Sequence, residues 1–220
     1  MAVTLDLDRA SYGRLLLPDA DLRAVRFFAE DISSVDGQHP SFDERAATGG
    51  LRPQYDETDT TAIRRGMRLN RAPGRLWAWV REEAPVGLLD DLPPDLDLID
   101  CTDQEFDDVA PALHAALAGF VAPASGQWRR LAVATKIIHL KRPRLVPILD
   151  RNVLAVLGLH LPDDAAQAAQ VSMGLEAARL IREVGRHNRA GLTDIEAQLK
   201  AAGNPRPPAR ILDALLWLAY

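Results

Sequence analysis

One aspartate, Asp150, lies near the end of a run of basic residues and is the best candidate for chemistry in this chain of 220 residues. From residue 125 to residue 151 it is the single carboxylate among seven cations, Arg129, Arg130, Lys136, Lys141, Arg142, Arg144 and Arg151. This stretch, the basic run, has a charge of +6, which leaves −11 for the rest of a chain whose net charge is −5. Such a concentration of positive charge is the expected footprint of an anion-binding site. The alternative is a solvated helix face with salt bridges to the acidic remainder.

The position of Asp150 suits both a catalytic and a structural role. It follows "VPIL" and precedes "RNVLAVLG", which is where the N-cap of a helix belongs. A carboxylate at this position accepts backbone N–H bonds and lies at the positive end of the helix. Arg129 and Lys136 share one face of the preceding helix, and the prolines of "KRPRLVP" stiffen the connecting loop. The sequence therefore predicts a fixed carboxylate framed by cations, or a helix cap and nothing more.

The elements that position these residues are predicted to be helices, because apolar residues recur at helical spacing along most of the chain. Residues 36–57 are polar and predict a long loop, and only residues 1–8 alternate as a strand does. Thr102 or Asp103 is expected to cap the helix that leads to residue 120, and Pro143 is expected to end the helix of the basic run. We expect a mostly α fold, a multi-helix bundle, with helices over 18–33, 58–70, 74–83, 105–120, 128–142, 151–158, 163–188, 192–203 and 208–220.

The segment 85–106 is acidic and interrupted by prolines, so it predicts a boundary between an N-terminal helical region, residues 1–100, and a core, residues 101–220; one continuous domain is the alternative. The single cysteine, Cys101, excludes an internal disulfide framework and is expected to be a small semi-buried residue in a cytoplasmic protein. No segment reaches the roughly 18 apolar residues of a membrane span, and no signal peptide is visible. The five histidines are scattered, so we expect no metal site, and the absence of nucleotide-binding glycine motifs predicts no cofactor.

Two segments carry a resemblance to known families. The helix, the basic proline turn, the apolar "VPI", and the aspartate that begins a new helix resemble the second half of the helix-hairpin-helix signature of DNA glycosylases. More closely, "ATKIIHLKRPRLVPILDRNV" and the terminal "RILDALLWL" resemble an uncharacterised bacterial family with a Lys-Arg-Pro-x-Leu-x-Pro-x-Tyr-Asp-Arg pattern. The close resemblance covers about a quarter of the chain.

The glycosylase resemblance implies a helix-hairpin-helix core in which Asp150 is the catalytic carboxylate of an N-glycosylase. It also implies phosphate contacts from Gly126 of the hairpin and from the cations of the basic run, and stacking of an extruded base on Trp128. The partner would be DNA or another phosphate-bearing ligand, and the substrate DNA or a nucleoside-type compound.

The chain departs from the glycosylase pattern at the hairpin. In "VAPASGQW" Gly126 is the only glycine, whereas the signature uses several to bring backbone amides close to a phosphate. Arg129 and Arg130 stand near the place of the lysine found in glycosylases with lyase activity, and an arginine cannot form a Schiff base. The resemblance therefore implies a monofunctional enzyme. A nucleic-acid-binding module without catalysis and a helical interaction module remain alternatives.

Overall fold

In a computed structural model of the protein, the described residues are 3–7, 16–33, 42–49, 54–67, 69, 72–121, 130–162 and 165–220. The chain is mostly helical within these residues, as the sequence predicts. The elements are β1 (Leu5–Asp6), β2 (Leu16–Leu17), α1 (Ala20–Ser33), α2 (Phe42–Gly49), α3 (Glu57–Gly66), α4 (Gly74–Glu82), the 3₁₀ helix η1 (Val86–Leu89), α5 (Asp103–Phe120), α6 (Leu131–His139), α7 (Arg151–Val156), α8 (Gln167–His187), α9 (Arg189–Ala201) and α10 (Pro208–Leu218).

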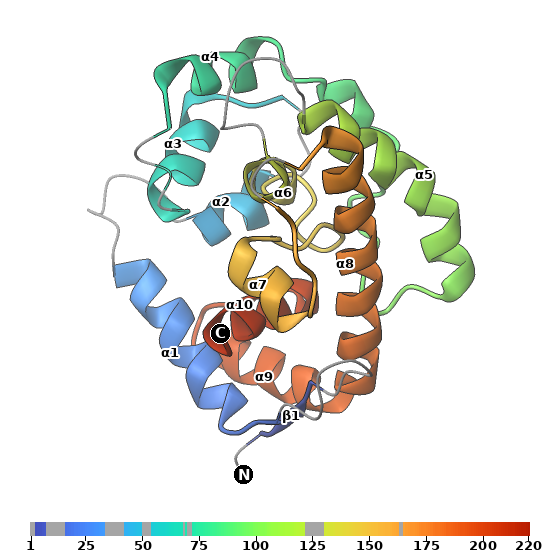
Figure 1. The fold of residues 1–220 in the computed structure, drawn as a ribbon. Helices are drawn as coiled ribbons and strands as arrows, with labels where there is room; N and C mark the ends of the chain where they lie inside the picture. The colour runs from blue at the N-terminus through green and yellow to red at the C-terminus, as the bar shows by residue number, and fades with distance from the viewer. Residues whose placement is uncertain are drawn as a thin grey trace.

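The short helix α6 occupies the middle of the fold. Figure 1 looks along its axis, with the long helices α5 and α8 on one side and α2 and α3 on the other. Helices α5 and α8 pack against each other, and both also contact α6. Seven of the nine residues of α6 are buried, because apolar side chains project from it in nearly every direction. The two exceptions are Ala132 and Lys136, so Lys136 is the one charged side chain of α6 that reaches solvent.

The N-terminal and C-terminal segments of the chain pack together. Helix α1 contacts α9 and α10, and the two-residue strands β1 and β2 pair antiparallel beside them. The amide of Asn188 donates to the backbone carbonyl of Asp6 and accepts a hydrogen bond from its N–H at 2.7 Å. One hydrophobic core cluster runs from Val3 to Leu216. The domain boundary predicted near residue 100 stays a prediction, and this core extends on both sides of it.

Most predicted helices are present with altered ends. Thr102 caps α5 in a reciprocal capping box with Glu105, as one of the two predicted candidates. Helix α6 ends at His139, four residues before Pro143, and α9 begins three residues earlier than the predicted 192–203. Gly158 follows α7 with a positive φ of 65°, where glycine ends a helix without a Cβ clash.

One prediction is wrong. The expected loop 36–57 contains the helix α2. Its sequence, "FDERAATG", is polar, so periodicity gives little signal. The helix is held instead by tertiary contacts of Phe42 and Ala46, both buried in the core, and of Asp43, which is buried in an ion pair.

Candidate functional site

Asp150 is the N-cap of α7, as its position in the sequence predicts. Its Oδ1 accepts hydrogen bonds from the backbone N–H groups of Asn152 at 3.0 Å and Val153 at 3.1 Å. The other oxygen, Oδ2, makes no hydrogen bond within the part of the chain that the structure describes, and the side chain is half-buried. One oxygen thus fixes the carboxylate in place while the other remains available to a ligand.

Lys136 is the cation of the basic run on which the charge of Asp150 acts. Its half-buried ammonium makes no hydrogen bond or ion pair among the described residues. Burial lowers the pKa of Lys136, and the negative charges of Asp150 and Asp213 act in the opposite direction. Two of the predicted site residues, Lys136 and Asp150, therefore lie close enough for the charge of Asp150 to raise the pKa of Lys136.

A buried ionic network, whose members Arg210 and Asp213 also act on Lys136, lies close to this pair. The sequence analysis did not predict it. The guanidinium of Arg210 on α10 pairs through Nε with Asp43 Oδ1 of α2 at 2.7 Å, and through Nη1 with Asp213 one turn along its own helix. Burial raises the pKa of Asp213 to about 6, against the charge of Arg210. Burial and the charge of Arg210 lower the pKa of His139 to about 4. The imidazole of His139 is therefore neutral near pH 7, and its Nδ1–H donates to the carbonyl of Val146 at 2.6 Å.

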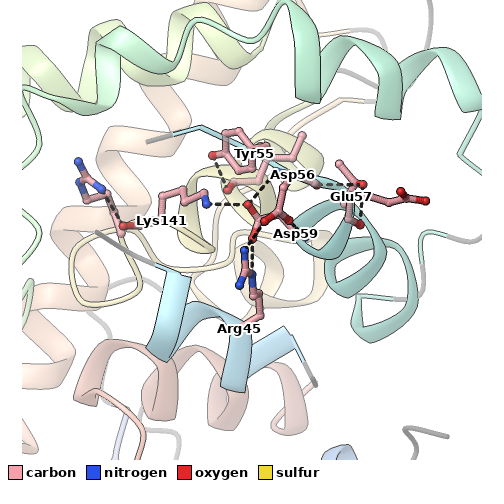
Figure 2. Close-up of polar contacts among 9 residues, drawn as sticks. Arg45, Tyr55, Asp56, Glu57, Asp59 and Lys141 are labelled. Carbon is pink, nitrogen blue, oxygen red and sulfur yellow. Dashed lines mark hydrogen bonds and ion pairs between the residues drawn. The ribbon is translucent and has the colours of Figure 1, made fainter. Parts of the chain in front are cut away.

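Two predicted phosphate contacts, Lys141 and Arg142, are buried inside the protein. Lys141 is 1% exposed; its Nζ lies 2.7 Å from Asp59 Oδ2 and 5.0 Å from the centroid of the Tyr55 ring. Figure 2 shows this ammonium pointing toward Asp59, which Arg45 approaches from α2. Since neither cation faces solvent, we take both out of the phosphate-binding set.

Arg142 holds the acidic segment 85–106 against the basic run. Its Nε and Nη2 donate to the backbone carbonyls of Leu92 at 2.6 Å and Leu89 at 2.5 Å. Arg144 adds an ion pair to Asp97 at 3.4 Å, and its carbonyl accepts from the N–H of Leu98 at 3.0 Å. Much of the local positive charge therefore serves internal contacts.

The remaining predicted contacts fall into two groups. Arg144 and Arg151 are exposed, and Arg151 directly follows Asp150 at the first position of α7; Arg130 is half-buried before α6. Gly126, Trp128 and Arg129 lie outside the described residues, so the predicted hairpin contact and base-stacking contact stay predictions.

Other features of the described residues carry less chemistry. Cys101 is buried, its Sγ lies 3.2 Å from the carbonyl oxygen of Leu98, and burial raises its pKa, so it is not an activated nucleophile. No group of three or more metal-binding side chains occurs in these residues. None of their helices combines the length and apolar character needed to cross a membrane.

The residues that the sequence analysis missed are those that hold the main chain before Asp150. The N–H of Ile148 donates to Asp213 Oδ2 at 2.9 Å, and the N–H of Leu149 donates to Thr135 Oγ1 at 3.1 Å. Thr135 lies in "ATKIIHLK" and Asp213 in "RILDALLWL", the two segments on which the closer family resemblance was based. The presence of both residues in these two segments was the information in the sequence that could have pointed to them.

Comparison with protein families gives one match. The family described as "Family of unknown function (DUF6308)" matches residues 71–220, which include α4 to α10 and the whole candidate site around Asp150. Comparisons with curated proteins and with solved structures found no match. The match spans more than half of the chain, and the protein therefore belongs to this family of unknown function.

Proposed function

We propose that the protein hydrolyses an N-glycosidic bond in DNA or in a nucleoside-type substrate, with Asp150 as the catalytic carboxylate. The observation that carries this proposal is that only one of the two Asp150 carboxylate oxygens accepts hydrogen bonds from the described residues. Two backbone N–H groups fix Oδ1, while Oδ2 is not used by the described residues. A carboxylate held in this way stabilises a positive charge that develops next to it without having to reorganise.

The reaction fits the charges around the site. When the bond between the sugar and the base breaks, its electron pair leaves with the base, and the sugar carbon takes on oxocarbenium character. Asp150 would stabilise that cation, water would add to the sugar carbon, and the proton released from water would balance the charge of the departing base. The half-buried Lys136 and the exposed Arg151, which directly follows Asp150, would attract the phosphates on either side of the sugar.

We further propose that the reaction stops at base release. Arg130 stays protonated and cannot form a Schiff base. Burial lowers the pKa of the Lys136 amine, and the charge of Asp150 acts on it, so Lys136 is the residue at which Schiff-base formation would be sought. Treatment of a reaction mixture with borohydride should therefore trap no covalent adduct. An adduct that disappears in Lys136→Gln would contradict the monofunctional part of the proposal.

The main test is base release from single-stranded and double-stranded oligonucleotides that each contain one damaged or mismatched base. We expect release by the wild-type protein and a loss on the order of a hundredfold or more in Asp150→Asn, because the developing cation loses its counter-charge. Asn is as good an N-cap as Asp, so this variant keeps the helix start. A folded Asp150→Asn protein with unchanged activity would end the case for Asp150.

Binding of nucleic acid without catalysis is the second candidate, and the exposed side chains of Arg144 and Arg151 favour it. DNA affinity should fall as salt rises, and Arg151→Gln should lower the slope of log affinity against log salt by about 1. Arg81→Gln, which removes the same charge from an exposed position on α4, is the matched control. Salt-dependent binding with no base release would favour this candidate. Absence of DNA binding would remove it, together with DNA as the substrate of the proposed hydrolase.

A further inference from the structure

The segment 146–149, which directly precedes Asp150, is held by side chains from α6 and from α10, and the α10 residue lies 65 positions away along the chain. No strand among the described residues pairs with it, so its backbone polar groups need other hydrogen bonds. The carbonyl of Val146 accepts from His139, the N–H of Ile148 donates to Asp213, and the N–H of Leu149 donates to Thr135. All four of the residues that precede Asp150 in this segment are buried.

Thr135 is placed to act on Asp150 at short range. It is fully buried on α6, where its hydroxyl donates to the carbonyl of Leu131 at 2.9 Å. The lone pairs of the same oxygen accept the N–H of Leu149, the residue directly before Asp150. This hydrogen bond holds the peptide plane between Ile148 and Leu149, which directly precedes the peptide that joins Leu149 to Asp150. A side chain on α6 therefore anchors the main chain one residue before the N-cap of α7.

Asp213 supplies a second anchor one residue earlier. It is 2% exposed, and its two oxygens have separate tasks: Oδ2 accepts from Ile148, while Oδ1 accepts from Arg210. Arg210 is in turn held by both oxygens of Asp43. The segment before Asp150 is thus connected to α2 through two buried ion pairs, and the anchor cannot rotate freely.

We propose that Thr135 and Asp213 are positioning residues that hold Asp150 in its site by fixing the N–H groups of Leu149 and Ile148. This inference deepens the proposed function and rests on it where turnover is concerned. The position of Asp150 itself can be measured without any substrate, through the backbone amides of Asn152 and Val153 that donate to its Oδ1.

The test compares Thr135→Val with Thr60→Val by amide hydrogen exchange and amide chemical shifts in solution. Thr60 is a matched control, because it is also a buried helical threonine whose hydroxyl donates to backbone carbonyls, those of Glu57 at 3.1 Å and of Asp56, the N-cap of α3, at 3.3 Å. Valine keeps the shape of threonine but cannot accept the N–H of Leu149. We expect Thr135→Val to speed exchange at Leu149 roughly 3- to 10-fold, which corresponds to one lost hydrogen bond. The amides of Asn152 and Val153 should shift, and Thr135→Ser should restore them.

Asp213→Asn, read at the amide of Ile148, provides a second variant should Thr135→Val fail to fold. Uniform changes in exchange across the protein, equal in Thr135→Val and Thr60→Val, would overturn the proposal, because they indicate a general loss of stability. On a substrate that the wild type turns over, Thr135→Val should lower kcat on the order of tenfold to a hundredfold with little change in KM. A wild type without activity would defeat the proposed function, while the amide measurements would still decide whether Thr135 positions Asp150.

Discussion

The ammonium of Lys141 lies 2.7 Å from the carboxylate of Asp59, 82 residues earlier in the chain, and both side chains are 1% exposed. Asp59 also accepts hydrogen bonds from Arg45 and from the N–H of Asp56 (Figure 2). A buried ion pair whose members have further partners ties its elements together, but it leaves no charge for a ligand. The most basic part of the sequence therefore contributes at least as much to holding the fold as to the candidate site.

Removing one member of this pair should be costly. Lys141→Met leaves the buried Asp59 carboxylate without one of its cations, and we expect a loss of about 3 kcal/mol in the free energy of unfolding. Arg144→Met removes a cation that is exposed and lies 3.4 Å from its partner, so it should cost less than about 1 kcal/mol. Urea denaturation of both variants checks the contrast. Equal losses would show that Lys141 is not the buried structural cation described above.

How much the sequence could reveal depended on the distance along the chain between interacting residues. Helix α5 and its cap at Thr102 follow from local spacing, and so does Asp150 at the start of α7. The partners of Lys141 and Arg142 lie about 80 and 50 residues away, and no local pattern pairs a buried lysine with a particular aspartate. Charge density alone therefore favoured an anion site where the structure has internal ion pairs.

The residues before 71 should be required for the family region to fold. Arg210 and Lys141 lie within the matched residues 71–220, whereas their counter-ions Asp43 and Asp59 precede them. We expect a fragment of residues 71–220 to lack a cooperative unfolding transition, because Lys141 loses its counter-ion, Arg210 keeps only Asp213, and the apolar contacts of α1 to α3 are lost as well.

Point variants of the full chain separate charge from lost contacts. Asp43→Asn and Asp59→Asn should each destabilise the protein by about 3 kcal/mol or more. Asp56→Asn is the control, since Asp56 is largely exposed and Asn can also cap α3. A fragment 71–220 with a sharp thermal transition would show that the family region is a domain by itself.

The two roles of Asp150 should separate in stability measurements. Asp150→Asn keeps the side-chain oxygen that accepts from Asn152 and Val153, so its free energy of unfolding should stay within about 0.5 kcal/mol of the wild-type value. Asp150→Ala removes the cap and should cost about 1 kcal/mol. Thermal and urea unfolding of both variants checks this. Equal destabilisation by Asn and Ala would mean that the negative charge itself supports the fold.

His139 and Asp213 should give the protein two opposite pH dependences that largely cancel. The pKa of His139 is about 4 in the folded protein and 6.5 ordinarily, so the unfolded chain takes up this proton first and stability is lost as pH falls from about 6.5 to 4. The pKa of Asp213 is about 6 rather than 3.8, so the folded protein binds this proton first and stability is gained as pH falls from about 6 to 4. Each effect amounts to about 3 kcal/mol when fully developed.

Single variants should reveal how each group changes the free energy of unfolding with pH. His139→Gln removes the imidazole titration and leaves that of Asp213, so the free energy of unfolding of this variant should rise as pH falls from 6 to 4. Asp213→Asn removes the carboxyl titration and should lose stability over the same range, because the uptake of a proton by His139 in the unfolded chain is then unopposed. Urea unfolding at pH 4, 5, 6 and 7 measures both, with the double variant as the control that should show neither slope. Parallel profiles for the wild type and both single variants would contradict the assignment of these two groups.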